Sequence, residues 1–194
     1  LPTGERVAVK VRRPGIEALI EADLAVLGDL AALADRHIPD AKLYNLPKLV
    51  EEFARTIRRE QDLVREGRTI ERVAANFDGD PTVRFPRIHW PMTAPSVLTM
   101  EFLDGVKLSA VGTPAAPEAD PGLVARRGAD AVLKQILQHG LFHADLHPGN
   151  ILVLPGNVVA FVDFGIVGRV NSRMRERLAE TILALGSRDS DRLA

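Results

Sequence analysis

The sequence predicts an α+β fold in two lobes, and three observations support this prediction. Near the start, over 7–11, valines alternate with Ala8 and Lys10, which is the period of a β-strand. Two long stretches, 17–37 and 45–73, instead carry apolar residues at helical spacing. Further along, the apolar runs ILVL and VVAFV, separated by PGN, predict a β-hairpin between helices.

The first strand has two different faces, one carrying three valines and the other carrying Ala8 and Lys10. A lysine inside a strand is mildly disfavoured, and here it shares its face with a small residue. This arrangement suits a nucleotide that lies on the strand, with Ala8 against the base and Lys10 reaching the phosphates. The alternative is a solvated lysine on an edge strand.

Two helices follow, and the first of them, over 17–37, is rich in Ala, Leu, Glu and Asp. The second helix has Asn45 as its expected cap and Pro47 in its first turn, and it is predicted to run to Val73. Its apolar stripe, which predicts its buried face, consists of Leu46, Leu49, Val50, Phe53, Ile57 and Val64.

Glu60 falls on this stripe of the second helix. A carboxylate there is costly unless it is paired, because an uncompensated buried charge costs about 3 to 5 kcal/mol. Lys10 is the natural partner, and the alternative is that Glu60 reaches solvent at the edge of the stripe. Asp62 lies about 200° further around the helix, so it cannot make the same contact.

Shorter elements follow the second helix. Two short strands are predicted over 83–90 and 97–102, punctuated by prolines. The stretch GTPAAPEADPG, at 112–122, is rich in Pro and Gly and is the best candidate for a flexible boundary.

The last part of the chain is predicted to be mainly helical. Asp120 caps a helix that Pro121 opens and Gly140 ends. The hairpin comes next, and a final helix begins near Ser172.

The segment HADLHPGN, at 143–150, is the first cluster of candidate catalytic and metal-binding residues in this part of the chain. It places Asp145 and Asn150 five residues apart on a loop, where a carboxylate can face a substrate hydroxyl and an amide oxygen can face a metal. His143 and His147 raise the alternative of a zinc site. That alternative is disfavoured, because the sequence has no Cys and because Asp145 would have to turn to the same point as the two histidines.

The triplet DFG, at 163–165, contains the second candidate metal-binding residue, Asp163. Asp163 follows Asn150 by 13 residues, and a tight hairpin between them would bring the two side chains together. Two oxygen ligands of this kind suit Mg²⁺, which takes the rest of its ligands from water and phosphates.

The composition excludes several other classes of function. The net charge of −1 argues against nucleic-acid binding, which needs a clustered basic excess. Without cysteine there is no disulfide framework and no thiolate metal site. No apolar run approaches the ~20 residues of a membrane-spanning helix. Arginine outnumbers lysine by 20 to 5, which is typical of bacterial genes rich in G and C.

Taken in order, the motifs resemble those of known kinases. VAVK, the helical Glu60, MEFLDG, the Asp-x₄-Asn loop and DFG resemble the protein-kinase signature set. VAVKVRRPGI, EQD followed by VREG, HADLHPGN and VDFG resemble the UbiB/AarF family of atypical kinase-like proteins, which is associated with isoprenoid-quinone pathways. The resemblance covers essentially the whole chain and implies a two-lobe protein-kinase-like fold.

The resemblance also implies roles for individual residues. Lys10 would contact the α- and β-phosphates and pair with Glu60, and Asp145 would be the catalytic base. Asn150 and Asp163 would hold Mg²⁺. The expected contacts with the adenine base come from Ala8, Met100 and the backbone of Glu101 and Leu103. The remaining motif positions are Asp62, His143, Phe164 and Gly165.

The sequence departs from these families in several places. Ala144 stands where ordinary kinases carry Arg, and no APE-like triplet follows, so recognition of peptide substrates is not expected. The Ala-rich nucleotide loop and the K-x-G-Q motif of the family lie upstream of the strand lysine, and only nine residues precede Lys10 here. We therefore expect a fragment, incomplete at both ends, with lobes over 1–103 and 104–194.

The function implied by the resemblance is that of a bacterial, Mg²⁺-dependent ATP-binding protein, an ATPase or a kinase. Its cofactors would be ATP or ADP and Mg²⁺, and its partner a lipid or quinone precursor. It would lie in the cytoplasm or at the inner membrane, attached only through regions outside this chain. One alternative is a small-molecule phosphotransferase of the aminoglycoside or choline kinase type. Another is a non-catalytic scaffold that binds nucleotide.

Overall fold

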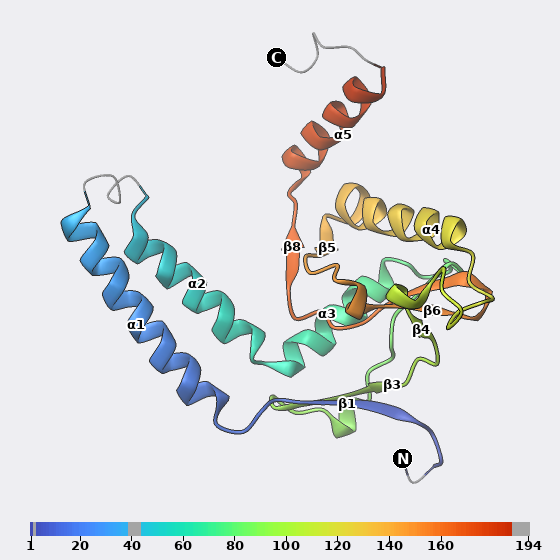
Figure 1. The fold of residues 1–194 in the computed structure, drawn as a ribbon, viewed down its shortest axis with the longest axis horizontal. Coiled ribbons are helices and arrows are strands. Elements are labelled where there is room, and N and C mark those ends of the chain that lie inside the picture. The colour runs from blue at the N-terminus through green and yellow to red at the C-terminus, as the bar shows by residue number, and fades with distance from the viewer. Residues whose placement is uncertain (2, 39–43, 188–194) are drawn as a thin grey trace. The chain divides into compact units, whose positions relative to one another are not determined.

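A computed structural model describes residues 1, 3–38 and 44–187; the side chains of Glu60 and of residues 184–187 lie outside this description. Helices and short strands are mixed along the chain, as predicted for an α+β fold (Figure 1). No helix among the described residues is long and apolar enough to cross a membrane.

The chain packs as two compact units. The first unit consists of Leu1–Ala8, Glu66–Ile88 and Met100–Ala194, and the second of Val9–Arg65 and His89–Thr99. The predicted boundary between lobes at 103 and 104 stays a prediction.

The second unit is dominated by a pair of helices that lie side by side (Figure 1). These are α1, Ile16–His37, and α2, Leu46–Glu60. Arg58 on α2 forms two hydrogen bonds with Glu21 on α1, both of 2.7 Å. Strand β1, Val7–Val11, forms a two-stranded sheet with β3, Val97–Glu101.

The predicted continuous helix over 45–73 is wrong. The structure has two helices there, α2 and then α3, Leu63–Ala75. The break falls where the Oδ1 atom of Asp62 accepts a hydrogen bond from the N–H of Val64 at 3.0 Å. Aspartate favours such N-cap positions because its side chain satisfies an otherwise unpaired N–H of the first turn.

The start and the stripe of α2 also differ from expectation. Asn45 has a left-handed backbone, with φ 47°, and forms no side-chain cap bond, although Pro47 does lie in the first turn. The predicted buried stripe is wrong in part: Leu49 is 60% exposed and Phe53 49%, and Ala54 is buried instead, whereas Leu46, Val50, Ile57 and Val64 are half-buried. Because Val64 lies on α3, the stripe is not continuous past Glu60 and gives no argument that Glu60 is buried.

The first unit contains most of the short strands. A four-stranded sheet has the order β2-β7-β6-β4, and a separate pair joins β5 to β8. The strands of the larger sheet are β2, Val83–Arg84; β4, Val106–Lys107; β6, Ile151–Leu154; and β7, Val158–Phe161. The smaller pair consists of β5, Leu141–His143, and β8, Val167–Arg169.

The hairpin prediction is confirmed, because β6 and β7 pair antiparallel from Ile151 opposite Phe161 to Leu154 opposite Val158. The predicted strand over 83–90 is mostly wrong, since only β2 and a single bridge from Ile88 to Met100 form. Pro86 interrupts this segment, and proline cannot donate a ladder hydrogen bond.

The helices of the first unit begin where predicted. Asp120 caps α4, Pro121–Leu133, through Oδ1, which accepts from Gly122 N at 2.8 Å and Leu123 N at 3.0 Å. A π-helical turn, Lys134–His139, continues α4 and ends at Gly140, whose backbone is left-handed with φ 64°. The final helix, α5, spans Ser172–Ser187.

Aromatic side chains form the centre of the first unit. Phe85 lies 5.9 Å from Phe161 and 5.8 Å from Phe164 between ring centroids, and Phe77 lies 5.4 Å from Phe85. The ring of His143 adds to this cluster at 4.6 Å from Phe164. The cluster therefore packs the Phe of DFG against the first residue of HADLHPGN.

Candidate functional site

Strand pairing in the first unit brings the 143–150 loop and the DFG triplet together. At the open end of the β6–β7 hairpin, the N–H of Val162 donates to the carbonyl of Asn150 at 2.9 Å. Beside the β5–β8 pair, Ala144 N donates to Ile166 O at 3.1 Å. Asp163 follows Val162 directly, so the backbone places it next to Asn150.

Asp145 and Asn150 are linked through the amide group of Asn150. Its Nδ2 atom donates to the carbonyl oxygen and to the Oδ2 atom of Asp145, each at 3.1 Å. Because the amide nitrogen is committed to Asp145, the Oδ1 atom is the part of Asn150 that can accept a cation. Asp145 itself is exposed.

His143 is the buried support of this loop, with 1% of its surface exposed. Its Nδ1 atom accepts the N–H of Asp145 at 3.1 Å, and its Nε2 atom lies 3.3 Å from the carbonyl of Val162. These bonds assign the hydrogen to Nε2 in the neutral ring. Both nitrogens are therefore occupied, which leaves neither of them for a zinc ion.

Burial is the main influence on the charge of His143. It lowers the pKa of His143 below its ordinary value of 6.5, and this effect exceeds the opposing effects of the Val162 hydrogen bond and of the Asp145 and Asp163 carboxylates. The ring is therefore held neutral, in the form that can accept the N–H of Asp145.

Asp163 has an unusual backbone conformation. Its φ of 63° lies in the left-handed region, which costs energy for a residue other than glycine. The next residue, Phe164, is 1% exposed and packs on His143 and Phe85. This buried ring anchors the segment, so the packing sustains the strained position of the carboxylate. The N–H of Gly165 donates to Asp163 Oδ1 at 3.4 Å.

The oxygen atoms of Asn150 and Asp163 fit a hard cation such as Mg²⁺, which prefers carboxylate and carbonyl oxygens. Within the described part of the chain, no group of three or more His, Cys, Asp or Glu side chains is placed to hold a metal. His147 is exposed, and its Nδ1 atom accepts the N–H of Gly149 at 3.1 Å.

Three of the residues expected to contact the base, Met100, Glu101 and Leu103, lie at or just after the end of β3. Met100 and Leu103 are buried, at 7% and 9% exposure. The N–H of Glu101 donates to the carbonyl of Arg87 at 2.8 Å. A base contact from Glu101 would therefore come from its carbonyl oxygen.

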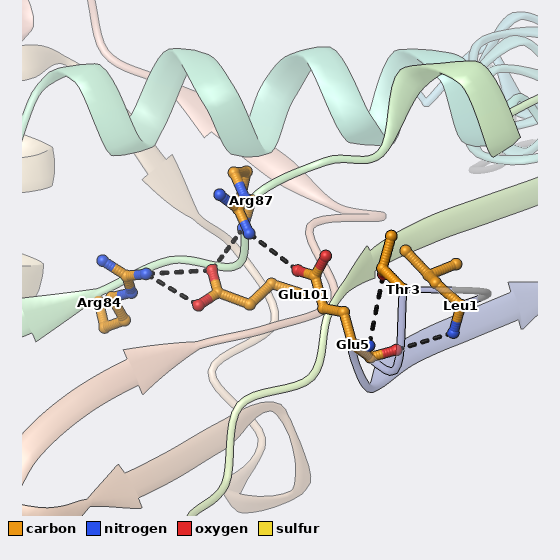
Figure 2. A network of polar contacts seen from close by, with 6 residues as sticks. All are labelled: Leu1, Thr3, Glu5, Arg84, Arg87 and Glu101. Carbon is orange, nitrogen blue, oxygen red and sulfur yellow. Dashed lines mark hydrogen bonds and ion pairs between the residues drawn. The ribbon is translucent and has the colours of Figure 1, made fainter.

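The Glu101 side chain belongs to a surface network of polar contacts (Figure 2). It accepts from Arg84 at 2.9 and 3.1 Å and from the N–H of Arg87 at 3.1 Å, while the Arg87 guanidinium also binds Glu5 at 2.8 Å. Burial raises the pKa of the Glu101 carboxyl, but these hydrogen bonds and the two arginine charges lower it more. The carboxylate therefore stays ionised and fixes the end of β3.

Strand β1 has the two faces that its alternation predicts. Ala8 and Lys10 are half-buried and Val9 and Val11 are exposed, although Val7, on the same face as these two valines, is also half-buried. Lys10 thus lies on the better covered face rather than on the open one. Glu60 is the last residue of α2, and its side chain lies outside the described residues. The pairing of Lys10 with Glu60 stays a prediction.

Two buried polar residues were missed in the sequence. Glu66, in α3, is 4% exposed, and it follows Leu63 by three residues and precedes Ile70 by four. This helical spacing indicates that Glu66 lies on the buried face of α3. The spacing can be recognised only when α3 is treated as a helix separate from α2. Gln135 is fully buried and its Oε1 atom accepts the N–H of His143 at 2.9 Å, a contact that no local pattern indicates.

An α+β chain whose HADLHPGN loop and DFG triplet converge beside a hairpin in this way is a kinase-like protein. Residues 1–194 match the model of the ABC1 atypical kinase-like domain. The chain belongs to this family, and the resemblance to the UbiB/AarF proteins is confirmed.

Curated relatives and a solved structure agree with this assignment. The chain is 37% identical to the probable protein kinase UbiB of Pseudomonas fluorescens (strain SBW25) over 198 residues, which cover all of this chain and 37% of the relative. The same protein of Azotobacter vinelandii is 37% identical, with the same coverage. The chain thus spans little more than a third of the length of these relatives.

The fold is similar to that of Rv3197 from Mycobacterium tuberculosis, solved as a complex with erythromycin. The TM-score is 0.76 at 24% identity, and the match covers 97% of this chain and 47% of the other. This similarity supports the kinase-like fold.

Proposed function

We propose that this kinase-like protein binds ATP together with Mg²⁺ and either transfers the γ-phosphate or hydrolyses it. The observation that carries the proposal is that Asn150 binds Asp145 through its side chain and accepts, through its carbonyl, the N–H of Val162, the residue before Asp163. Phosphoryl transfer depends on positioning and charge compensation, and a carboxylate base beside two oxygen ligands supplies both.

Asp145 is proposed as the base that orients the attacking hydroxyl or water. Its exposure leaves room for an acceptor, and its Oδ2 atom is fixed by Asn150. The N–H of Asp145 is held by the neutral ring of His143. The carboxylate is therefore oriented from two sides before an acceptor binds.

Asn150 and Asp163 are proposed to hold Mg²⁺ through Oδ1 and the carboxylate. When bound, the metal would neutralise charge on the phosphates. Lys10 would contact the phosphates, while Ala8, Met100 and the backbone of Glu101 and Leu103 would contact the base. ATP or ADP is the proposed nucleotide.

The proposed acceptor is a lipid or a quinone precursor, and the proposed location is the cytoplasm or the face of the inner membrane. This part of the proposal rests on the relatives that carry the name UbiB and on the family's association with isoprenoid quinones. Turnover by the full-length protein with lipid, quinone-precursor, aminoalcohol, aminoglycoside and no acceptor separates the alternatives. Turnover only with the soluble aminoalcohol or aminoglycoside would contradict the proposed acceptor.

The metal role is tested by Asp163→Asn in the full-length protein. Asparagine tolerates the left-handed backbone, so the substitution removes the charge with little added strain. We expect the affinity for Mg²⁺-ATP, measured by calorimetric titration, to fall by about tenfold or more. The matched control is Asp78→Asn, at an exposed position outside the site, which should leave the affinity unchanged. Equal affinities in Asp163→Asn and the unmodified protein would remove the metal role.

A further inference from the structure

A cavity of about 560 Å³ lies in the first unit and begins at Asp104, directly after Leu103 of the segment expected to contact the base. Three segments line it: 104–106, which contains the start of β4, 115–119, and 153–157, which contains the turn between β6 and β7. None of the proposed site residues is among its lining residues. Its volume is in the range of about 300 to 1,000 Å³ that small-molecule sites occupy.

The walls of the cavity are fixed by hydrogen bonds. The Oδ1 atom of Asn157 accepts the N–H of Asp120 at 2.8 Å, which ties the 112–122 segment to the β6–β7 turn. Arg127 on α4 donates to the carbonyls of Gly156 at 2.7 Å and Asn157 at 2.6 Å. A Cβ atom at Gly105 would lie 2.6 Å from Leu154 Cδ2, so this wall is in close contact with β6. The cavity is therefore largely formed before any ligand binds.

The lining combines an apolar surface with negative charge. Its apolar part includes Val106, Ala115, Ala116, Pro117, Val153 and Leu154. Its charged members are two carboxylates, Asp104 and Glu118, and among the described residues no Lys, Arg or His lines the cavity.

The two carboxylates are only partly compensated. Asp104 lies 3.6 Å from Arg6, and both side chains are largely exposed, so this ion pair is weak. No ion pair joins Glu118 to another side chain in the part of the chain that the structure describes. A ligand that carries a positive charge can therefore gain an electrostatic contact here, whereas an anion meets two like charges.

We propose that this cavity binds a small apolar molecule that carries a protonated amine. The apolar body lies against β4, β6 and the 115–117 segment, and the ammonium group faces Glu118 and Asp104. The proposal is independent of the nucleotide site, because it uses none of the same side chains.

The test compares three probes that share one alkyl chain, decylamine, decanol and decanoate, on the full-length protein without nucleotide. Affinity is measured by calorimetry, and the site is located by NMR shifts of the methyl groups of Val106, Ala116 and Val153. We expect decylamine to bind more tightly than decanol, and decanoate to bind least. Equal binding of decylamine and decanoate, or shifts confined to other methyl groups, would overturn the proposal.

Two variants and a control sharpen this test. Glu118→Gln should weaken decylamine binding by about fivefold and leave decanol binding unchanged. Ala115→Trp, at an exposed lining position, should fill the cavity and abolish binding of decylamine and decanol. Glu176→Gln, an exposed carboxylate on α5, should change nothing. Unaltered decylamine binding in Ala115→Trp would place the probe elsewhere and overturn the proposal. Because no nucleotide is present, failure here is distinct from failure of the proposed ATP site.

Discussion

At the scale of single residues, His143 links the core to the site. Its ring packs on Phe164, its backbone N–H binds Gln135, and its Nδ1 atom holds the N–H of Asp145. Protonation of Nδ1 would remove the acceptor for that N–H and place a charge in the aromatic core. The neutral ring is thus needed for both packing and the position of Asp145.

The state of His143 predicts how stability depends on pH. Its folded pKa is lowered below 6.5, so the unfolded chain binds the proton more readily and stability falls as the pH drops below 6.5. Urea unfolding at about pH 7.5 and about pH 5.5 should show this loss. His143→Gln should reduce the loss, whereas His147→Gln, at an exposed position, should not. Equal pH dependence in His143→Gln and the unmodified protein would contradict the prediction.

The partner of Lys10 can be identified by double-mutant cycles. We expect Lys10→Ala and Glu60→Ala to couple in their effects on Mg²⁺-ATP affinity, by about 0.5 to 3 kcal/mol for residues in contact. Glu66→Ala gives the comparison, since Glu66 is a buried carboxylate on α3, the helix that follows α2 in sequence. If the effects of Lys10→Ala and Glu60→Ala on affinity are additive, Lys10 and Glu60 do not form the proposed pair. If Lys10→Ala couples only with Glu66→Ala, Glu66 is the partner of Lys10 instead.

At the scale of elements, the features specified by residues close in sequence were predicted correctly, and those that depend on distant segments were not. The β6–β7 hairpin and the Asp120 cap follow from residues close in sequence, and both were predicted. The break between α2 and α3 was missed because apolar spacing continues across it, while the cap at Asp62 that starts α3 is a single side chain. Strand β2 pairs in parallel with β7, and no local pattern specifies that partner.

Asp62 provides a prediction for helix α3. Because its Oδ1 atom caps the helix, Asp62→Ala should lower the free energy of unfolding by about 1 kcal/mol. Asp62→Asn should change it by only a few tenths of a kcal/mol, since asparagine caps about as well. Urea unfolding followed by circular dichroism measures both variants. Equal losses in the two variants would mean that the charge of Asp62, rather than the cap, is what stabilises the protein.

At the scale of the whole molecule, the order of the motifs was enough to predict the kinase-like fold and the family. The closeness of the 143–150 loop and DFG was also foreseen, because a hairpin between them leaves few other arrangements. The buried positions of Glu66 and Gln135 and the cavity beside β4 depend on packing between distant segments. Sequence spacing alone carries no information about such packing.

The ion pair between Lys134 and Asp80, in the first unit, predicts how the stability of the protein depends on pH. Lys134, just beyond α4, donates to Asp80 at 2.7 Å across 54 residues of sequence, and the hydroxyl of Thr82 donates to the same carboxylate at 2.6 Å. The hydrogen bond from Lys134, followed by those from Thr82, lowers the pKa of Asp80 from 3.8 to about 2. The ionised carboxylate therefore stabilises the fold fully above about pH 4, and this contribution disappears as the pH falls towards 2.

Asp80→Asn should accordingly lower the free energy of unfolding by about 1 to 2 kcal/mol at neutral pH, a value reduced for solvent screening because Lys134 is partly exposed. The difference from the unmodified protein should narrow below about pH 4, because both chains then lack the charge. Asp78→Asn, two residues away and exposed, is the matched control and should have little effect at any pH. An NMR titration of the Asp80 carboxyl gives an independent measurement, and a midpoint at or above 3.8 would show that Lys134 and Thr82 do not stabilise its ionised form.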